Sequence, residues 1–329
     1  MADRGFEIRD LLGWAAVASL VLTAMTARAA EKVSVVMDAG FNGRHAYYFV
    51  AIEKGYYEAV GLDVQVVRGQ GSADAIKQVA AGNAQFGFAD AGSVVLARGN
   101  DQVPVKLVAI VYARPPHAIY ALKESGISTP KDLEGRKIAN PAGGAIPKMF
   151  PAYAKAAGID AGRVTWVVAP SESLPSLLTL GRVDAVGQFT VGEPLLRKQA
   201  APKELVQLTY ADAGLDFYSN GLIAADGTIQ RQPELVRRFV AATLHGLKDA
   251  IADPQEAARI LNKHHREVEV EIAAGEVEMV RSLAVVPQMV LGTIDPNRVR
   301  RTIELVSDAF DLKHPIAPEE VFVPDMVAK

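Results

Sequence analysis

The residues best suited to bind a small polar molecule lie in short loops that follow apolar stretches of the chain. Their side chains carry hydroxyl, amide, carboxylate, imidazole and aromatic groups, and glycine lies among them. The candidate ligand-binding residues are Phe41, Asn42, Arg44, His45, Gln70, Ser72, Asp90, Ser93, Tyr112, Gly143, Gly144, Ser171, Gln188, Phe189 and Glu193. Small residues let a ligand approach backbone N–H groups, and aromatic rings stack on flat ligands. Phe41 and Phe189 are the preferred stacking candidates because their neighbours are polar.

Catalysis and metal binding have no candidate residues in this sequence. The six histidines show neither H-E-x-x-H nor H-x-H spacing. The turn at residues 69–71 lacks the third glycine of a dinucleotide fingerprint, and no phosphate-binding loop or G-x-S-x-G turn occurs. The chain has no cysteine, which excludes thiolate nucleophiles, thiolate metal sites and disulfides. We therefore predict no catalytic residue, no metal and no cofactor.

Charge and length narrow the class of protein further. The net charge is −3 with both signs interspersed, so neither nucleic acid nor an anionic membrane surface is expected as a partner. A chain of 329 residues suggests about two domains. Burial alone must stabilise it, and a chain of this length buries enough surface. A monomer is expected.

The first thirty residues predict export. Arg4 and Arg9 precede an apolar run at 11–25, and Ala27-Arg28-Ala29 has the small-residue pattern of a signal peptidase site. A membrane anchor is the alternative, but a span needs about 20 apolar residues and this run is shorter. We predict a cleavable signal peptide over 1–29 and a periplasmic protein. It is not expected to be a lipoprotein, because no cysteine follows the signal.

Strands and helices alternate in the part of the chain that carries the first candidate loops. Strands are predicted over 32–37, 62–67 and 85–89, and helices over 45–57 and 73–81, with Ser72 as an N-terminal cap. This alternation indicates an open, mostly parallel α/β sheet. Ligands of such sheets bind beyond the carboxyl ends of the strands, which is where the candidate loops lie.

One unit of strand, serine turn, helix, glycine and strand occurs twice. Ser72 lies ten residues before Gly82, and Ser171 lies ten residues before Gly181. The second unit is predicted as strand 163–168, helix 174–180 and strand 183–188. The repeat favours two related α/β lobes, each an open sheet with helices on both faces. The alternative is that any two such units look alike.

The double proline Pro115-Pro116 suits a crossover between the lobes, since it fixes the backbone and removes donors. We predict the first part of lobe 1 over 30–114, lobe 2 over 115–218, and a return to lobe 1 with C-terminal helices over 219–329. Those helices are expected over 233–251, 254–264, 268–283 and 296–310. They carry apolar faces at helical spacing and are interpreted as packing.

Four segments resemble a known family. They read YFVAIEKGYYEAVGLDV at 48–64, AAGNAQFG at 80–87, ISTPKDLEGRKI at 127–138 and LGRVDA at 180–185. This order is similar to that of solute-binding proteins for nitrate, sulfonates, taurine and thiamine-pyrimidine precursors. The resemblance implies a two-lobed, type II periplasmic-binding-protein fold that closes on a small-molecule ligand and delivers it to an ABC transporter permease.

An enzymatic branch of the same family is the fungal thiamine-pyrimidine synthase. That enzyme carries a lysine and a histidine after its third strand, and a cysteine-rich run later. The corresponding positions here look like Ala89 and Ser93, and cysteine is absent. An enzyme is therefore disfavoured.

The ligand within the family stays open between two chemistries. The aromatic residues of the loops, and the lack of an evident arginine clamp, favour a nitrogen heterocycle such as a thiamine-pyrimidine precursor. A sulfonate, taurine or nitrate is the alternative, with Arg44, Arg114 or Lys148 as anion partners and Ser72 and Ser171 as donors. A receptor that signals to a membrane sensor would have the same sequence features.

Overall fold

The structure is a computed structural model that describes residues 30–327. The predicted signal peptide, residues 1–29, lies outside the described residues. Within 30–327, no helix is both long enough and apolar enough to cross a membrane.

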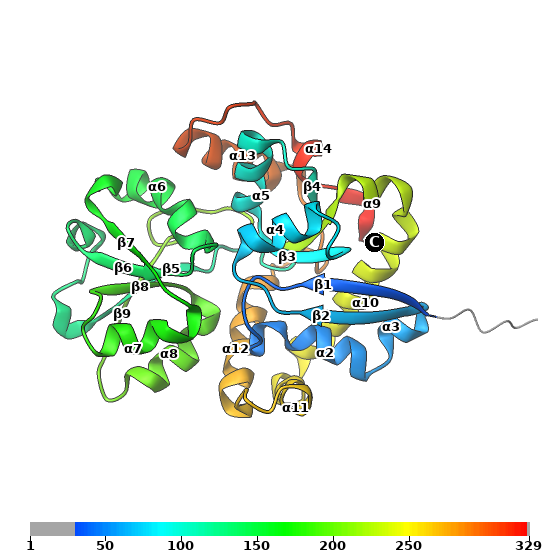
Figure 1. Cartoon of the computed structure of the whole chain (residues 1–329), viewed down its shortest axis with the longest axis horizontal. Coiled ribbons are helices and arrows are strands. Elements are labelled where there is room, and N and C mark those ends of the chain that lie inside the picture. Colours follow the sequence, from blue (N-terminus) through cyan, green and yellow to red (C-terminus); the bar gives the residue numbers. More distant parts are fainter. Residues whose placement is uncertain (1–29, 328–329) are drawn as a thin grey trace, which may run out of the picture.

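Two five-stranded sheets of the same topology organise the chain, one in each lobe (Figure 1). The lobe 1 sheet has the order β2-β1-β3-β10-β4 and the lobe 2 sheet the order β7-β6-β8-β5-β9. The lobe 1 strands are β1 (Glu31–Val36), β2 (Leu62–Val67), β3 (Phe86–Asp90), β4 (Val105–Ile110) and β10 (Asn220–Ala225). The lobe 2 strands are β5 (His117–Leu122), β6 (Lys137–Asn140), β7 (Thr165–Val168), β8 (Ala185–Phe189) and β9 (Leu205–Thr209).

The internal repeat is confirmed by the order of the strands. β2 and β3 flank β1, and β7 and β8 flank β6, so the two predicted units hold equivalent places in their sheets. In each sheet one strand, β10 or β5, runs antiparallel to both of its neighbours, while the other strands run in one direction. The prediction of two mostly parallel sheets is therefore correct, with one reversed strand in each.

The reversed strands are the ones that the chain forms as it crosses between lobes. The first crossover leads from β4 into β5, and the second leads from β9 into β10. A crossover reaches its new sheet at the end where the parallel strands finish, which faces the other lobe. The strand that follows the crossover therefore starts at that end and runs in the direction opposite to the parallel strands. The lobe boundaries at 114 and 218 stay predictions, and strands on either side of them belong to different sheets.

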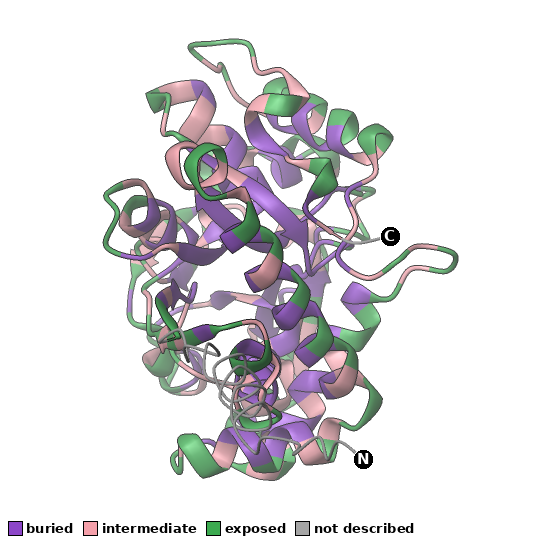
Figure 2. Cartoon of the chain, turned by 90° about the vertical axis from the view of Figure 1, so that its right-hand side faces the viewer, coloured by how far each residue is buried: buried purple, intermediate pink, exposed green. Residues whose placement is uncertain are grey.

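Helices cover both faces of each sheet, and buried residues concentrate on the strands between them (Figure 2). The helices are α2 (Ala46–Glu53), α3 (Tyr56–Ala59), α4 (Ser72–Ala80), α5 (Ala91–Asp101), α6 (Ala145–Ala157), α7 (Leu174–Thr179), α8 (Glu193–Ala200), α9 (Asp226–Arg231), α10 (Pro233–Ala252), α11 (Pro254–His264), α12 (Val270–Ala284), α13 (Pro296–Ala309) and α14 (Pro318–Val321). Short 3-10 turns include η1 (Gly43–His45), η5 (Ser171–Ser173) and η6 (Thr190–Gly192). One hydrophobic cluster extends from lobe 1 into lobe 2, and a smaller one lies within lobe 2.

Two local predictions were wrong. The helix expected over 45–57 is interrupted because Gly55 adopts φ 73°, a left-handed conformation that ends α2 and starts α3. Ser72 does not cap α4, whose N-cap residue is Gly71. The Ser72 hydroxyl instead accepts a hydrogen bond from the Asp90 backbone N–H at 3.1 Å, so it joins two loops of lobe 1.

Close packing of α10 on α2 depends on Gly246. A Cβ at this position would collide with the Tyr47 carbonyl oxygen and with Ala51. We expect Gly246→Ala to lower the free energy of unfolding by about 1–3 kcal/mol in urea titrations, although alanine is the better helix former. Gly40→Ala is the control, since nothing lies within 4 Å of its Cβ position. If the Gly246→Ala protein is as stable as the wild type, the packing of α10 on α2 does not require glycine at this position.

Candidate binding site between the lobes

Polar residues of lobe 1 meet at the sheet edge that faces lobe 2. Asp38 follows β1 and Asp90 ends β3, so both lie at the carboxyl ends of parallel strands. Asn220 begins the antiparallel strand β10, whose amino end lies at the same edge. In lobe 2, the carboxyl ends of β6 and β8 and the amino end of β5 bring together Asn140, Phe189 and His117 by the same rule.

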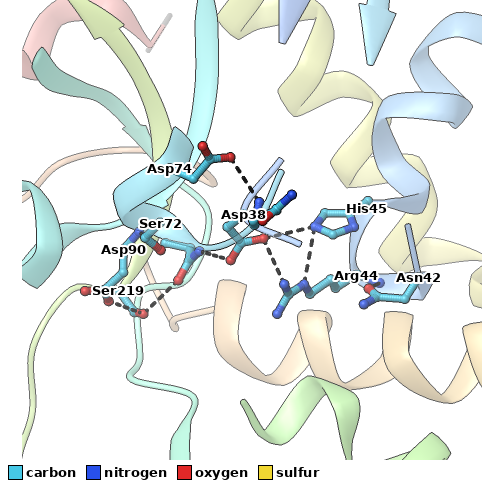
Figure 3. Close-up of polar contacts among 10 residues, drawn as sticks. Asp38, Asn42, Arg44, His45, Ser72, Asp74, Asp90 and Ser219 are labelled. Carbon is cyan, nitrogen blue, oxygen red and sulfur yellow. Dashed lines mark hydrogen bonds and ion pairs between the residues drawn. The ribbon is translucent and has the colours of Figure 1, made fainter. Parts of the chain in front are cut away.

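A buried hydrogen-bond network joins the lobe 1 residues (Figure 3). The Asn220 amide donates to Asp38 Oδ2 at 2.8 Å. The neighbouring Ser219 hydroxyl lies 2.9 Å from Asp90 Oδ2 and 3.1 Å from Asn220 Oδ1 and can donate to either. Asp90 Oδ1 also accepts from the Ser93 N–H at 2.9 Å. The second crossover therefore ties the ends of β1 and β3 together.

Arg44 and His45 point toward Asp38 from the turn η1 (Figure 3). Arg44 Nη2 donates to Asp38 Oδ1 at 2.8 Å, and His45 Nε2 lies 3.2 Å from the same oxygen. Burial would raise the pKa of the Asp38 carboxyl, but the Arg44 guanidinium and the hydrogen bonds from His45 and Asn220 hold it below its usual value. Burial lowers the pKa of His45 to about 4, so its imidazole is neutral at pH 7. Asp38 thus stays ionised and paired.

His117 is the corresponding polar group of lobe 2. Its side chain is fully buried, and burial lowers the pKa of its imidazole. Nε2 lies 3.4 Å from Asp90 Oδ2 without the alignment of a hydrogen bond. The ring packs against Phe189 at 4.9 Å, Phe217 at 5.2 Å and Tyr210 at 5.4 Å between centroids. An aromatic wall therefore faces the carboxylates of lobe 1.

The two lobes touch across this region. The Arg44 guanidinium lies over the Phe189 ring, 5.5 Å from its centroid. The backbones of Gly71 and Gly143 meet so closely that a Cβ on Gly71 would collide with Gly143. The Ala73 N–H donates to the Gly143 carbonyl at 3.3 Å. The lobes are therefore in a closed arrangement, and glycine is required where their loops meet.

Several buried polar atoms in this region lack a hydrogen-bond partner among the described residues. They are His45 Nδ1, His117 Nδ1 and Nε2, Asn140 Oδ1 and the Tyr112 hydroxyl. Buried polar groups are normally hydrogen-bonded, so these atoms are free to bond a solute held between the lobes. Among residues 30–327, no group of three or more metal-ligating side chains occurs.

Glu276 of α12 adjoins the same region. Its side chain is 2% exposed, and its Oε2 accepts from the Gly43 backbone N–H at 2.5 Å. Burial raises the pKa of the Glu276 carboxyl to about 7, against the opposite effects of the Gly43 N–H and the Arg44 charge. This carboxyl therefore titrates near neutral pH.

The structure brings many of the predicted residues to the interface of the lobes. They are Asn42, Arg44, His45, Ser72, Asp90, Ser93, Tyr112, Gly143, Gly144 and Phe189. Asn42 is the N-cap residue of η1, where its side chain accepts from the Arg44 N–H. Ser93 donates to Asp90, and Gly144 adjoins the Asn140 side chain. Their part in binding remains a prediction.

Other predicted residues have different surroundings. Phe41 packs on His265 and Phe49 of its own lobe. Ser171 is exposed, and the Gln188 side chain folds over Gly192. Gln70 is exposed as well, although its carbonyl oxygen adjoins Gly143 of lobe 2. Glu193 bonds to neighbours within lobe 2, namely Tyr120, Gln207 and Arg197. These residues are therefore weaker candidates than the sequence suggested.

Sequence reasoning missed several residues of the region: Asp38, His117, Asn140, Ser219, Asn220 and Glu276. Asp38 could have been found, because it directly follows the strand predicted over 32–37, and Asn140 likewise ends a strand of the structure, β6. His117 follows the double proline and was considered only as a metal ligand. Glu276 had no signal beyond its place in a helix interpreted as packing.

Known proteins resemble this chain over most of its length. The "Formylaminopyrimidine-binding protein" of Halalkalibacterium halodurans is 29% identical over 310 residues, which cover 91% of this chain and 92% of the relative. The "Riboflavin-binding protein RibY" of Chloroflexus aurantiacus is 28% identical over 316 residues, or 90% of this chain and 86% of the relative. A "4-amino-5-hydroxymethyl-2-methylpyrimidine phosphate synthase" of Legionella pneumophila is 25% identical over 242 residues, or 70% and 73%.

Structural similarity agrees with the expected fold. The alkanesulfonate-binding protein SsuA from Xanthomonas axonopodis pv. citri, bound to MOPS, superposes with a TM-score of 0.68 at 13% identity. The match covers 90% of this chain and 98% of that one. The fold is that of two-lobed periplasmic binding proteins, as the resemblance implied. The family model described as "NMT1/THI5 like" matches residues 42–257, and the chain belongs to that family.

Proposed function

We propose that this protein is the periplasmic solute-binding component of an ABC importer and that its ligand is a small nitrogen heterocycle of the thiamine-pyrimidine precursor type. The ligand would lie between Asp38 and Asp90 of lobe 1 and His117 and Phe189 of lobe 2. Closure of the lobes would bury it, and release would follow their opening at the permease. The signal peptide predicted over 1–29 supports this proposal, because secretion would bring the protein to the periplasm, where such a component acts.

The charge of the buried network carries this proposal. Arg44 is paired with Asp38, Asp90 accepts hydrogen bonds from Ser93 and Ser219, and the burial of His45 and His117 favours their neutral forms. Among these described residues no cation is left unpaired for an anion, and the burial of an unpaired anion at low dielectric costs free energy. Amino and ring N–H groups of a heterocycle instead donate to carboxylates and to neutral imidazole nitrogens.

The basic residues that the sequence offered as partners of an anionic ligand also favour a nitrogen heterocycle, because none of them is a buried, unpaired cation. Arg44 is paired with Asp38, Arg114 donates to the Ser282 carbonyl, and Lys148 is exposed. The two binding proteins similar in sequence are named for a pyrimidine and a flavin, both nitrogen heterocycles. The sulfonate-binding neighbour shares the fold at low identity, which says nothing about the ligand.

Size favours the pyrimidine over the flavin. The lobes already touch through Gly71 and Gly143 and through Arg44 and Phe189. The lobes must therefore separate to admit a ligand, and a single ring requires less separation than a three-ring flavin. We also propose binding without turnover, since cysteine is absent and the positions matched to the synthase lysine and histidine are Ala89 and Ser93.

A thermal-shift screen tests the class of ligand. Formylaminopyrimidine at about 100 times its dissociation constant should stabilise the protein by about 2.7 kcal/mol and raise the melting midpoint. Riboflavin should give a smaller shift, and taurine, an alkylsulfonate and nitrate should give none. If an anion raises the midpoint while heterocycles leave it unchanged, the heterocycle assignment is wrong. Conversion of a bound pyrimidine to product, followed by mass spectrometry, would overturn binding without turnover.

Phe189 should stack on the ligand, and Phe41 should not. Removal of the Phe189 ring takes away the aromatic wall and the cation–π partner of Arg44, so Phe189→Ala should weaken pyrimidine binding about tenfold or more. Phe41→Ala is the matched control, because its ring packs against His265 and Arg68 within lobe 1. Titration calorimetry measures both affinities. If both variants lose the same amount of affinity for the pyrimidine, the ligand does not stack on Phe189.

A further inference from the structure

Helix α12 lies between the two lobes (Figure 1). It packs on η1 of lobe 1 and on η6 and α8 of lobe 2, where Gly275 abuts Pro194. Its carboxyl end holds the first crossover, because the Leu283 carbonyl accepts from the Ala113 N–H at 3.0 Å and the Ser282 carbonyl accepts from Arg114 at 2.8 Å. A change in how the lobes meet therefore changes the surroundings of α12.

Glu276 fastens the ligand-facing turn η1 to this helix. Its carboxyl accepts the Gly43 N–H, and a Cβ on Gly43 would collide with the Ala273 carbonyl oxygen, so turn and helix are in direct contact. The next two residues of the turn, Arg44 and His45, are those that point toward Asp38. The position of both side chains thus depends on the bond between Glu276 and Gly43.

No cation is paired with Glu276 among the described residues. Arg44 is the charged group that faces it and is already paired with Asp38, while Tyr112 faces it with a hydroxyl whose pKa is raised mainly by burial. His45 of η1 lies against Asp38, and η6 has no titratable side chain. On α8, α10 and α11 most charged side chains form ion pairs with residues other than Glu276. These pairs are Arg197 with Glu193, Lys198 with Glu269, Arg237 with Glu234, Arg238 with Glu31, Asp249 with Lys54, Arg259 with Glu256, and Lys263 and His264 with Glu53. Of the others, Lys248 is exposed and His245 stacks on Tyr56.

We propose that Glu276 is a positioning residue for the Arg44–His45 turn and that closure of the lobes over the ligand favours protonation of its carboxyl group by solvent. This inference rests on the proposed function, because closure is assumed to accompany ligand binding. Opening moves η6 and α8 away from α12, admits water and stabilises the carboxylate. Closure excludes that water, and the protonated carboxyl still accepts the Gly43 N–H through its carbonyl oxygen.

The sign of the pH dependence follows from the direction of the shift. The pKa of the Glu276 carboxyl is about 7 in the closed form. In an open, hydrated form it would approach the ordinary value, so closure takes up a proton at pH values between the two. Ligand affinity should therefore rise as the pH falls, by about tenfold between pH 8 and pH 6, and level off only below the ordinary value of 4.5.

Calorimetric titration with formylaminopyrimidine in two buffers of different ionisation enthalpy counts the protons taken up. At pH 7 the wild type should take up about half a proton per ligand. Glu276→Gln keeps an acceptor for the Gly43 N–H, so it should bind the pyrimidine without proton uptake and with a flat pH profile. Glu278→Gln, at an exposed position of the same helix, should behave as the wild type. Proton uptake that persists in Glu276→Gln would overturn the proposal.

A ligand-free readout separates this inference from the proposed function. We expect the ligand-free protein to populate the closed form as well, and in that form the pKa of Glu276 is higher than in the unfolded chain, so Glu276 contributes stability at low pH that is lost as the pH rises through 7. The melting midpoint of the wild type should fall from pH 6 to pH 8 more than that of Glu276→Gln. If the pyrimidine does not bind but this difference appears, the proposed ligand fails and Glu276 titrates as inferred. Parallel decline of both proteins would overturn the titration.

Discussion

The buried carboxylate of Asp38 is the interaction on which the rest of the site depends. It binds three separate parts of the chain: its own strand β1, the turn η1 through Arg44 and His45, and the second crossover through Asn220. A buried carboxylate is stable only when it is paired and hydrogen-bonded, so none of these partners can leave without a large cost in free energy. The position of the return crossover is thereby linked to the position of the binding turn.

That link matters because, within residues 30–327, the strands pass from one sheet to the other at two crossovers. Each crossover leads into the antiparallel strand of a sheet, so movement of one lobe reaches an interior strand of the other sheet directly. The polar residues lie where those strands begin, at Asn220 in lobe 1 and His117 in lobe 2. The candidate binding groups thus lie directly beside the crossovers, so a solute bound at this position would act on closure of the lobes.

The electrostatic balance of the interface bears on the class of ligand, which the fold alone does not decide. Arg44 is paired with Asp38. Asp90 accepts hydrogen bonds from Ser93 and Ser219 and forms no ion pair with Lys or Arg among the described residues. Burial also places the titration of Glu276 near neutral pH, so the charge of the site varies within the physiological range.

The sequence by itself determined the family, the α/β class and the two-lobed plan. The α/β class and the two-lobed plan follow from local patterns, namely the repeat of Ser72–Gly82 in Ser171–Gly181 and the alternation of strands and helices. Such patterns can be recognised without knowledge of the tertiary structure. The same logic placed Arg44, His45 and Asp90 beyond strand ends. Only the tertiary structure decided which candidates meet, because Phe41, Ser171 and Glu193 satisfy the same local rule and lie in other surroundings. His117 and Glu276 entered the site through contacts between segments far apart in the chain, which no spacing within a segment encodes.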